Sequence, residues 1–390
     1  MTVKKRMALS FQLLLCLFVK AVCRLLPGRK RSSDIWLFSE RGYDACDNAW
    51  ALFRYVRQRT PQRKIFYILS KDSPDVSKVS ACGRVLRRGS LRHLFLYFLP
   101  TVKISTHILG AAPYPALFCS RMGRRKLRAK GASVFLQHGV TCHDIPALYA
   151  EQTGTSLFVC AAVPEYEFVR TRFGYPAQAV CCPGFARFDD LAAARAGRDI
   201  LFFPTWRAAA ASLSEEAFCR TPYFAAILSL LSSEALFRLL EREDLRLVFA
   251  PHPEMRKFIS CFHTDGRRII LDTGDIGDMV RRSAVLITDY SSVMFDFAYA
   301  KRPVIYLDVE GLRAPHYPVG YFLRERDGFG PVVRSLPAFL AALADTVRRG
   351  FCTEPVYRER ADRFFPRRDR DNCRRNFEAI SEWIEKNRNI

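Results

Sequence analysis

Four short motifs in this sequence contain side chains that can move protons or bind phosphate, and each follows an apolar run. The motifs are Gln-His-Gly-Val-Thr at 137–141, Phe-Pro-Thr-Trp-Arg at 203–207, Ala-Pro-His-Pro at 250–253 and Asp-Tyr-Ser-Ser at 289–292. Histidine has the ordinary pKa that suits a general base near neutral pH. Arginine binds phosphate through its planar guanidinium, and serines at a helix start lie where phosphates bind. Together the motifs predict a phosphate or nucleotide site.

The last motif belongs to the most informative stretch of the chain. Residues 284–288 and 304–307 are short apolar runs, typical of buried parallel strands. Between them, Ser291 and Ser292 stand at the start of a predicted helix that also contains Asp296. Ser291 as a simple helix N-cap is one interpretation. The cluster of hydroxyls and carboxylates favours a second one, a phosphate or nucleotide site at the C-terminal end of a parallel strand.

The two histidines and the arginine of the other motifs each allow two interpretations. His138 ends a predicted strand before Gly139, which permits a tight turn or close approach of a substrate. It is either a general base or a histidine satisfied by backbone groups. His252 lies between two prolines in a rigid turn, and either contacts a phosphate or is a structural turn residue. Arg207 either holds a phosphate or is a solvated charge.

Several common sites are missing from the sequence. It has no GxxxxGK[ST] phosphate loop, no CxxC or HExxH metal spacing and no GxSxG elbow. The sequence therefore argues against a P-loop NTPase, a zinc site and a serine hydrolase, and it predicts no metal or other cofactor.

The motifs must be positioned by strands that alternate with helices, a pattern that predicts parallel sheets with crossover helices. We expect a membrane-contact helix over 1–32, an acceptor-side Rossmann-like domain over 33–192 and a donor-binding Rossmann-like domain with a helical tail over 198–390, with a cleft between the two domains. The predicted strands are 35–39, 64–69, 84–86, 102–106, 133–137, 157–161, 200–203, 245–250, 268–271, 284–288 and 304–307. The predicted helices include 44–59, 91–99, 164–172, 215–243 with a break near 221–222, 276–282 and most of 336–386.

Composition points to an anionic partner. Lys and Arg number 61 against 39 Asp and Glu, a net charge of +22, which favours nucleic acid, an anionic membrane or a polyanionic substrate.

Thirteen cysteines without metal-type grouping favour a reducing, cytosolic compartment. Residues 7–19 are apolar and flanked by basic residues, which predicts a helix in the membrane interface or, alternatively, one docked on the first domain.

The motifs resemble those of the CDP-glycerol glycerophosphotransferase family, which includes teichoic-acid primases and polymerases. The resemblance covers residues 35–365 and is strongest over 133–308. Five motifs in the family's order carry it: FLQHGVTCHD at 135–144, GFARFDDL at 184–191, FFPTWR at 202–207, APHP at 250–253 and ITDYSSVMFDFAYAKRPVIY at 287–306.

The resemblance implies an α/β fold of the GT-B type and an enzyme at the cytoplasmic face of a bacterial membrane. Such an enzyme transfers a polyol phosphate, first of all glycerol phosphate, from CDP-glycerol or CDP-ribitol to a hydroxyl of a lipid-linked or polymer acceptor. CMP is released, and the product is a teichoic-acid-like or capsular polymer. An anionic membrane surface is an implied partner, and nucleic acid is not.

Roles carried over by position make His138 the general base on the acceptor hydroxyl and His252 the contact that stabilises departing CMP. Asp296 is placed on a ribose or polyol hydroxyl. His143 stands where many members have the lysine of HGTPxK, and Phe249-Ala250 replaces an arginine that often precedes the third motif. The resemblance and the motifs together predict these substrate-binding residues: Gly139, Val140, Thr141, His143, Arg187, Thr205, Trp206, Arg207, Ser291, Ser292 and Asp296.

Two other classes of function stay open from the sequence. A GT-B glycosyltransferase using a nucleotide sugar for a surface polysaccharide would share the fold and the cleft. A non-catalytic nucleic-acid or membrane-binding protein would use the net charge of +22. Nucleic-acid readers usually show a basic stripe with stacking aromatics or a known module, and none is visible here.

Overall fold

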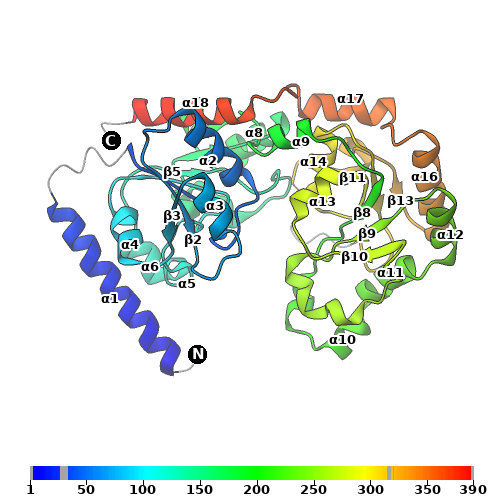
Figure 1. The fold of residues 1–390 in the computed structure, drawn as a ribbon, viewed down its shortest axis with the longest axis horizontal. Coiled ribbons are helices and arrows are strands. Elements are labelled where there is room, and N and C mark those ends of the chain that lie inside the picture. Colours follow the sequence, from blue (N-terminus) through cyan, green and yellow to red (C-terminus); the bar gives the residue numbers. More distant parts are fainter. Residues whose placement is uncertain (1–2, 27–33, 314–317, 319, 388–390) are drawn as a thin grey trace.

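The computed structural model describes residues 3–26, 34–313, 318 and 320–387. Within them the chain forms two α/β domains side by side, with helix α1 (Val3–Leu25) along the outer side of the first domain (Figure 1). The predicted boundary between the N-terminal helix and the first domain, at 32/33, lies outside the described residues.

Each domain is built on one parallel sheet, as the alternation of strands and helices predicts. The first sheet has the strand order β3-β2-β1-β4-β5-β6-β7, and the second has the order β10-β9-β8-β11-β12-β13. The strands are β1 (Trp36–Ser39), β2 (Ile65–Leu69), β3 (Arg84–Arg87), β4 (Val102–Ser105), β5 (Ser133–Phe135), β6 (Leu157–Val159), β7 (Val180–Cys181), β8 (Asp199–Phe202), β9 (Leu247–Phe249), β10 (Ile269–Leu271), β11 (Ser283–Thr288), β12 (Val304–Leu307) and β13 (Val332–Val333).

Helices cover both faces of the sheets, so the central strands β1, β2 and β11 are buried along their whole length. Seven helices of the described chain begin at a side chain that accepts a hydrogen bond from the backbone amide three residues on, at Ser90, Ser120, Ser214, Thr221, Ser233, Asp275 and Ser335. The helices after α1 are α2 (Asn48–Arg59), α3 (Val76–Cys82), α4 (Leu91–Phe98), α5 (Pro115–Cys119), α6 (Arg121–Lys126), α7 (Ala150–Thr153), α8 (Val163–Arg172), α9 (Phe188–Ala193), α10 (Glu215–Cys219), α11 (Pro222–Leu231), α12 (Glu234–Arg242), α13 (Ile276–Arg282), α14 (Val293–Tyr299), α15 (Arg324–Asp327), α16 (Leu336–Arg348), α17 (Pro355–Phe364) and α18 (Asn372–Lys386).

The predicted helix 215–243 is three helices, α10 to α12, with a second break at Ser232-Ser233. The side chain of Ser233 accepts from the Leu236 amide and so starts α12 anew. This break was missed because an apolar run continues up to it and no proline or glycine marks it.

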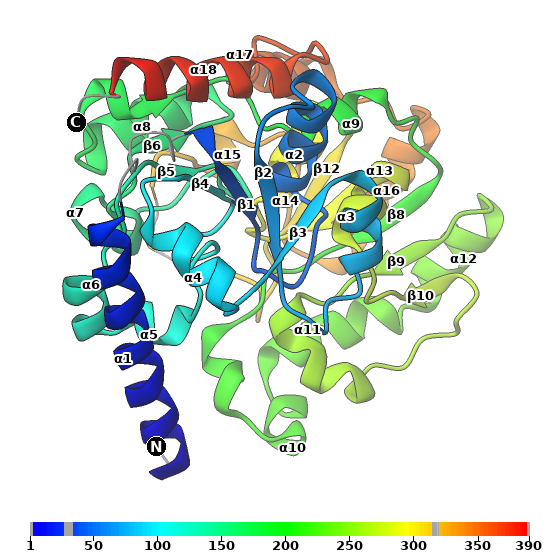
Figure 2. The same cartoon turned by 60° about the vertical axis from the view of Figure 1, so that its left-hand side comes forward.

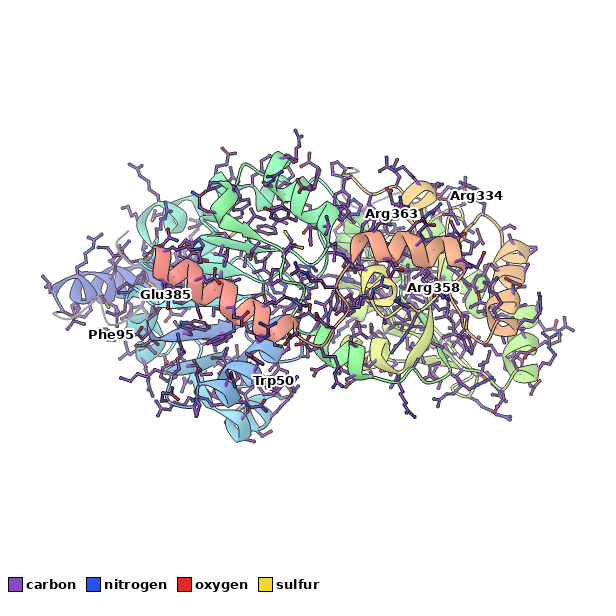
Figure 3. The ribbon with its side chains drawn as sticks, turned by 90° about the horizontal axis from the view of Figure 1, so that it is seen from above. Trp50, Phe95, Arg334, Arg358, Arg363 and Glu385 are labelled. Carbon is purple, nitrogen blue, oxygen red and sulfur yellow. The ribbon has the colours of Figure 1, made fainter. Side chains whose placement is uncertain are left out.

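The C-terminal helix α18 packs on the first domain, although it follows the second domain in the sequence (Figures 1 and 3). Cys373, Ile380 and Ile384 of α18 lie in the same apolar cluster as Trp36 of β1. The last helix therefore departs from the prediction that 198–390 form one domain. The apolar face of α18 packs against the core of the first sheet. The spacing of apolar residues in the sequence predicts a helix here, but it does not show which domain the helix packs on.

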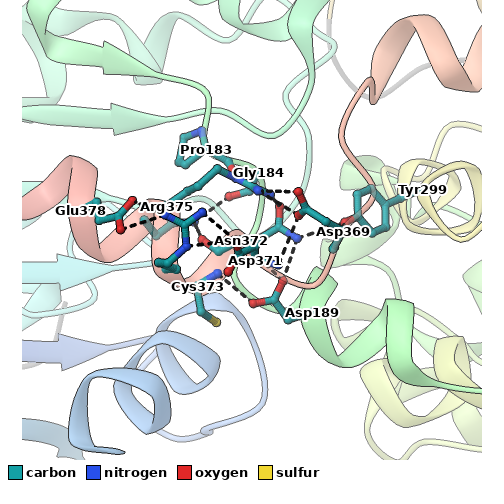
Figure 4. A network of polar contacts seen from close by, with 12 residues as sticks. Pro183, Gly184, Asp189, Tyr299, Asp369, Asp371, Asn372, Cys373, Arg375 and Glu378 are labelled. Atoms are coloured by element: carbon teal, nitrogen blue, oxygen red, sulfur yellow. Dashed lines mark hydrogen bonds and ion pairs between the residues drawn. The ribbon is translucent and has the colours of Figure 1, made fainter. Parts of the chain in front are cut away.

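Polar contacts fix the start of α18 (Figure 4). The Asn372 side chain donates to Asp189 Oδ1 at 2.8 Å and to the Tyr299 hydroxyl at 3.0 Å. The side chain of Asn376 donates to the Gly184 carbonyl at 2.8 Å. Since Asp189 belongs to α9 and Tyr299 to α14, this network joins the returning chain to both domains.

Candidate active site between the two domains

The four motifs lie at the C-terminal ends of parallel strands. The motif 137–141 follows β5, and the motifs 203–207, 250–253 and 289–292 follow β8, β9 and β11. Strand β8 lies between β9 and β11 in the second sheet. The three motifs that follow these parallel strands therefore lie side by side, at the C-terminal ends of the strands. This is the edge where open parallel sheets bind their ligands.

The first-domain motif contacts the second domain. A Cβ atom at Gly139 would lie 2.4 Å from Ser292 Oγ, so a larger residue at 139 would force the Ser292 side chain to move. Further along, the Asp144 amide donates to the Pro318 carbonyl at 3.3 Å. The motif ends of the two sheets therefore face each other, and the candidate site lies between the domains.

The turn before His138 is held in an unusual backbone conformation. Gln137 has φ 58°, in the left-handed region that non-glycine residues rarely adopt. Its side-chain amide donates to the Val159 carbonyl at 2.8 Å and to Glu165 at 2.9 Å. Its carbonyl accepts from the side chain of Asn48 at 2.9 Å. These contacts fix the direction in which the His138 side chain leaves the strand.

The His138 ring stacks on His107, with centroids 4.7 Å apart and planes 7° from parallel. Desolvation and the positive charge of Arg41 lower the pKa of His138 to about 4. A hydrogen bond to the Thr106 backbone acts in the opposite direction and raises the pKa in part. The ring is therefore neutral at pH 7. A hydrogen bond through one nitrogen leaves the other as a proton acceptor, which is what a general base needs.

His107 is a candidate site residue that the motif analysis missed. Its Nδ1 lies 3.0 Å from the Thr106 hydroxyl oxygen, and its Nε2 accepts a hydrogen bond from Arg41 Nε at 3.3 Å. Burial, with the nearby His138 and Arg41, lowers its pKa to about 3. It follows β4, the neighbour of β5 in the sheet. The rule that located His138, a histidine just after a parallel strand, would also have located His107.

His252 lies in the second domain beside Trp206, with ring centroids 6.0 Å apart and planes at 23°. Its Nδ1 accepts from the Glu254 amide at 3.3 Å. In a neutral ring the proton is then on Nε2, which can donate to a phosphate oxygen. The rigid turn predicted from the flanking prolines is thus also held by a hydrogen bond.

The buried Asp289 joins two of the second-domain motifs. Its Oδ1 accepts from the Thr205 and Tyr290 amides, each at 2.7 Å, and its Oδ2 accepts from Arg207 Nη2 at 2.8 Å. Arg207, predicted as a phosphate contact, is therefore paired with a carboxylate in this structure. Thr205 Oγ1 is buried and has no hydrogen-bond partner among the described residues, which leaves a hydroxyl for a ligand.

Arg187 and Asp296, both predicted as substrate contacts, form an ion pair across the domain boundary. Arg187 Nη2 donates to the two oxygens of Asp296 at 2.8 and 2.9 Å, and its Nη1 donates to Asp47 of the first domain at 3.0 Å. Burial raises the pKa of both carboxyls, and Arg187 opposes that shift. The three residues hold α2, α9 and α14 together.

The other predicted substrate contacts lie on both sides of the domain boundary. Ser292 faces Gly139 and is the N-cap residue of α14, but its side chain makes no capping hydrogen bond. Ser291, predicted as the N-cap, lies one residue earlier, and its Oγ accepts from the Val293 amide at 3.3 Å. Val140 and Thr141 are buried, and the Thr141 hydroxyl donates to Gln137. His143 Nδ1 lies 3.3 Å from the Pro318 carbonyl. Among the described residues, no group of three or more His, Cys, Asp or Glu could hold a metal ion.

Comparisons with known proteins agree with this arrangement. The family model of CDP-Glycerol:Poly(glycerophosphate) glycerophosphotransferase matches residues 171–382. The minor teichoic acid biosynthesis protein GgaB of Bacillus subtilis (strain 168) is 30% identical over 362 residues, which cover 89% of this chain and 40% of GgaB. The teichoic acid glycerol-phosphate transferase of Staphylococcus aureus (strain NCTC 8325 / PS 47) is 38% identical over 85 residues, 21% of each chain.

A solved structure of the wall teichoic acid polymerase TagF matches with a TM-score of 0.66 and 15% identity, covering 99% of both chains. At this identity the match shows the fold, which is of the GT-B type. The chain spans about 40% of the length of GgaB. The family match over more than half of the chain and the match to GgaB agree, and the chain belongs to the CDP-glycerol:poly(glycerophosphate) glycerophosphotransferase family.

Proposed function

We propose that the protein transfers glycerol phosphate from CDP-glycerol to a hydroxyl of a membrane-linked acceptor, releasing CMP, in the synthesis of a teichoic-acid-like polymer. The observation that carries this proposal is the contact of Gly139 with Ser292, which sets the histidine motif of one domain against the serine motif of the other. Membership of the family supports the reaction class. The names of GgaB and of the Staphylococcus aureus transferase support a teichoic-acid product.

The proposed reaction needs positioning, one base and charge stabilisation. The acceptor oxygen forms a bond to the β-phosphorus of the donor. The bond from that phosphorus to the bridging oxygen breaks, and its electron pair leaves with CMP. His138 takes the acceptor proton on its free ring nitrogen. His252 donates from Nε2 to the phosphate on which negative charge develops.

The donor contacts we propose are Thr205, Trp206, Ser291 and Ser292. The buried hydroxyl of Thr205 lacks a partner among the described residues, and Trp206 offers a ring face beside His252. Arg187, Arg207 and Asp296 already hold ion-pair partners within the protein. Their proposed part is to fix the walls of the donor site.

A panel of nucleotides tests the donor. CDP-glycerol is expected to raise the midpoint of thermal unfolding, because a ligand that binds only the folded chain stabilises it by about 2.7 kcal/mol at 100 times its Kd. CDP-ribitol and UDP-sugars are the matched comparisons, and CMP release with a lipid-linked acceptor is the second measurement. Stabilisation by UDP-sugars alone, without CMP release from any CDP-polyol, would favour the glycosyltransferase instead.

We also propose that α1 docks the protein peripherally on a membrane. Its outer side presents Met7, Phe11, Leu14 and Phe18, each 66–68% exposed, while its inner side packs on the first domain. By length and composition alone, residues 6–25 and 222–242 pass as membrane spans, and the second stretch is α11 and α12 in the second-domain core. An apolar outer side with a docked inner side suits a helix lying in the interface.

Replacing Phe11 and Phe18 by serine tests the docking. We expect the double variant to bind lipid vesicles at least tenfold more weakly, because each phenylalanine contributes about 1.5–3 kcal/mol when buried. Co-sedimentation with vesicles measures the binding. Val356→Ser, at an exposed apolar position of α17, is the control. Equal binding by all three proteins would contradict docking through α1.

A further inference from the structure

The positive charge of this chain is concentrated in two separate segments. Residues 1–33 contain eight Lys and Arg and no Asp or Glu, and residues 76–143 contain twelve and again no Asp or Glu. The rest of the chain has a net charge of only +2. The excess that suggested an anionic partner therefore belongs almost wholly to these two acid-free segments.

The described parts of the two acid-free segments lie together in the fold. Helix α1 runs beside α4, α5 and α6, all of which come from the second segment (Figures 1 and 2). Cys16 and Val19 of α1 share an apolar cluster with Leu94, Leu117 and Leu127. Lys20 Nζ donates to the Lys126 carbonyl at 2.8 Å. Two stretches far apart in the sequence thus form one cationic region without an acidic residue of its own.

Within this region, four cations surround a hollow near the C-terminal end of α1. Its volume is about 80 Å³, against roughly 30 Å³ for a water molecule in the liquid. None of the four cations forms an ion pair with a carboxylate among the described residues. The cations are Lys20, Arg24, Arg128 and Lys130, and Cys23, Phe98 and Pro100 complete the wall.

A buried lysine, Lys103, holds the backbone next to the hollow. Lys103 Nζ donates to the carbonyls of Thr101, at 3.1 Å, and of Lys130. It thereby ties the end of the 121–130 segment to the start of β4, next to Pro100. The backbone that presents Arg128 and Lys130 is therefore held in place, while their side chains are exposed and able to move towards a ligand.

We infer that this hollow binds the phosphate group of an anionic membrane lipid. The inference rests on the proposed docking of α1. Four cations held near one another repel, and a phosphate relieves that repulsion through charge-assisted hydrogen bonds. Two of them, Lys20 and Arg24, belong to the same helix as the exposed apolar side. A helix lying in the interface brings its cations to the level of the headgroups, so a lipid phosphate is the anion within reach.

Vesicle binding by the full chain tests the inference. The variant Arg128→Met/Lys130→Met removes two charges from the hollow, and the control Arg87→Met/Arg92→Met removes two from the same acid-free segment outside it. With vesicles of phosphatidylcholine containing phosphatidylglycerol, we expect the first pair to weaken binding at least tenfold more than the control. With phosphatidylcholine alone, the two variants should bind alike.

The possible outcomes separate the hollow from its alternatives. Equal losses from both pairs would mean a diffuse positive field and would overturn a phosphate site. Saturable binding of inorganic phosphate that depends on Arg128 and Lys130, without any lipid difference, would also overturn the lipid assignment. If Phe11→Ser/Phe18→Ser abolishes vesicle binding while the hollow variant binds normally, docking stands and this inference fails. None of these measurements needs turnover, so they do not depend on the proposed transfer reaction.

Discussion

Replacing His138 by alanine is expected to lower the rate of CMP release by about 100- to 10,000-fold, the usual contribution of a general base. The ring is neutral at pH 7 because its pKa is lowered to about 4, and it stands at the domain boundary next to Gly139, which contacts Ser292. The measurement is the turnover rate at saturating CDP-glycerol with a lipid-linked acceptor. The thermal unfolding midpoint shows whether the variant is folded.

Two further histidine variants make this result specific. His263→Ala removes an exposed histidine outside the motifs and should leave the rate unchanged. His107→Phe keeps a ring beside His138 without its nitrogens. A rate close to that of the unmodified protein would assign His107 a packing role. A loss as deep as that of His138→Ala would assign proton transfer to the stacked pair. A near-normal rate for His138→Ala would contradict the proposed base.

The second large effect is expected on stability, from Arg187→Met. This change leaves Asp47 and Asp296 buried without their shared cation, and breaking a buried ion pair from one side costs about 3–5 kcal/mol. Burial already raises the pKa of both carboxyls, and losing Arg187 raises the pKa further. A carboxyl with a raised folded-state pKa destabilises the fold as pH increases, so the defect should be larger at pH 8 than at pH 5. Thermal unfolding at the two pH values measures it.

Arg54→Met is the matched control for that prediction. Arg54 pairs with Asp190 of α9, but the two side chains are 36% and 44% exposed. An exposed pair contributes about 0–1 kcal/mol. Adding Asp296→Asn to Arg187→Met should restore part of the lost stability, since it removes one uncompensated carboxylate. Equal losses from Arg187→Met and Arg54→Met would contradict the structural role of the interdomain pair.

The sequence predicts the sheets and the location of the motifs well, because both depend on local patterns. The apolar runs 284–288 and 304–307 become β11 and β12, and the predicted helix 276–282 matches α13. Parallel strands end at the same edge, so the motifs after β8, β9 and β11 had to meet there. The two-residue strands β7 and β13 were missed, since two residues show no period.

Pairings between distant residues could not be predicted from single motifs. Asp289 stands next to the serine pair in the sequence, but its partners Thr205 and Arg207 are more than 80 residues away. Likewise, Arg187 and Asp296 each suggest a ligand contact when considered alone, and the fold turns them into partners of each other. A charged side chain in a motif shows that an opposite charge is needed, but not whether a ligand or the protein supplies it.

The return of α18 to the first domain has a consequence for how the protein is made. The apolar cluster around Trp36 includes Ile380 and Ile384, so the first domain lacks part of its core until α18 has left the ribosome. Domains usually fold one after another as the chain is synthesised. Here the second domain has its complete sheet before the first can be finished, and the order of completion is opposite to the order of synthesis.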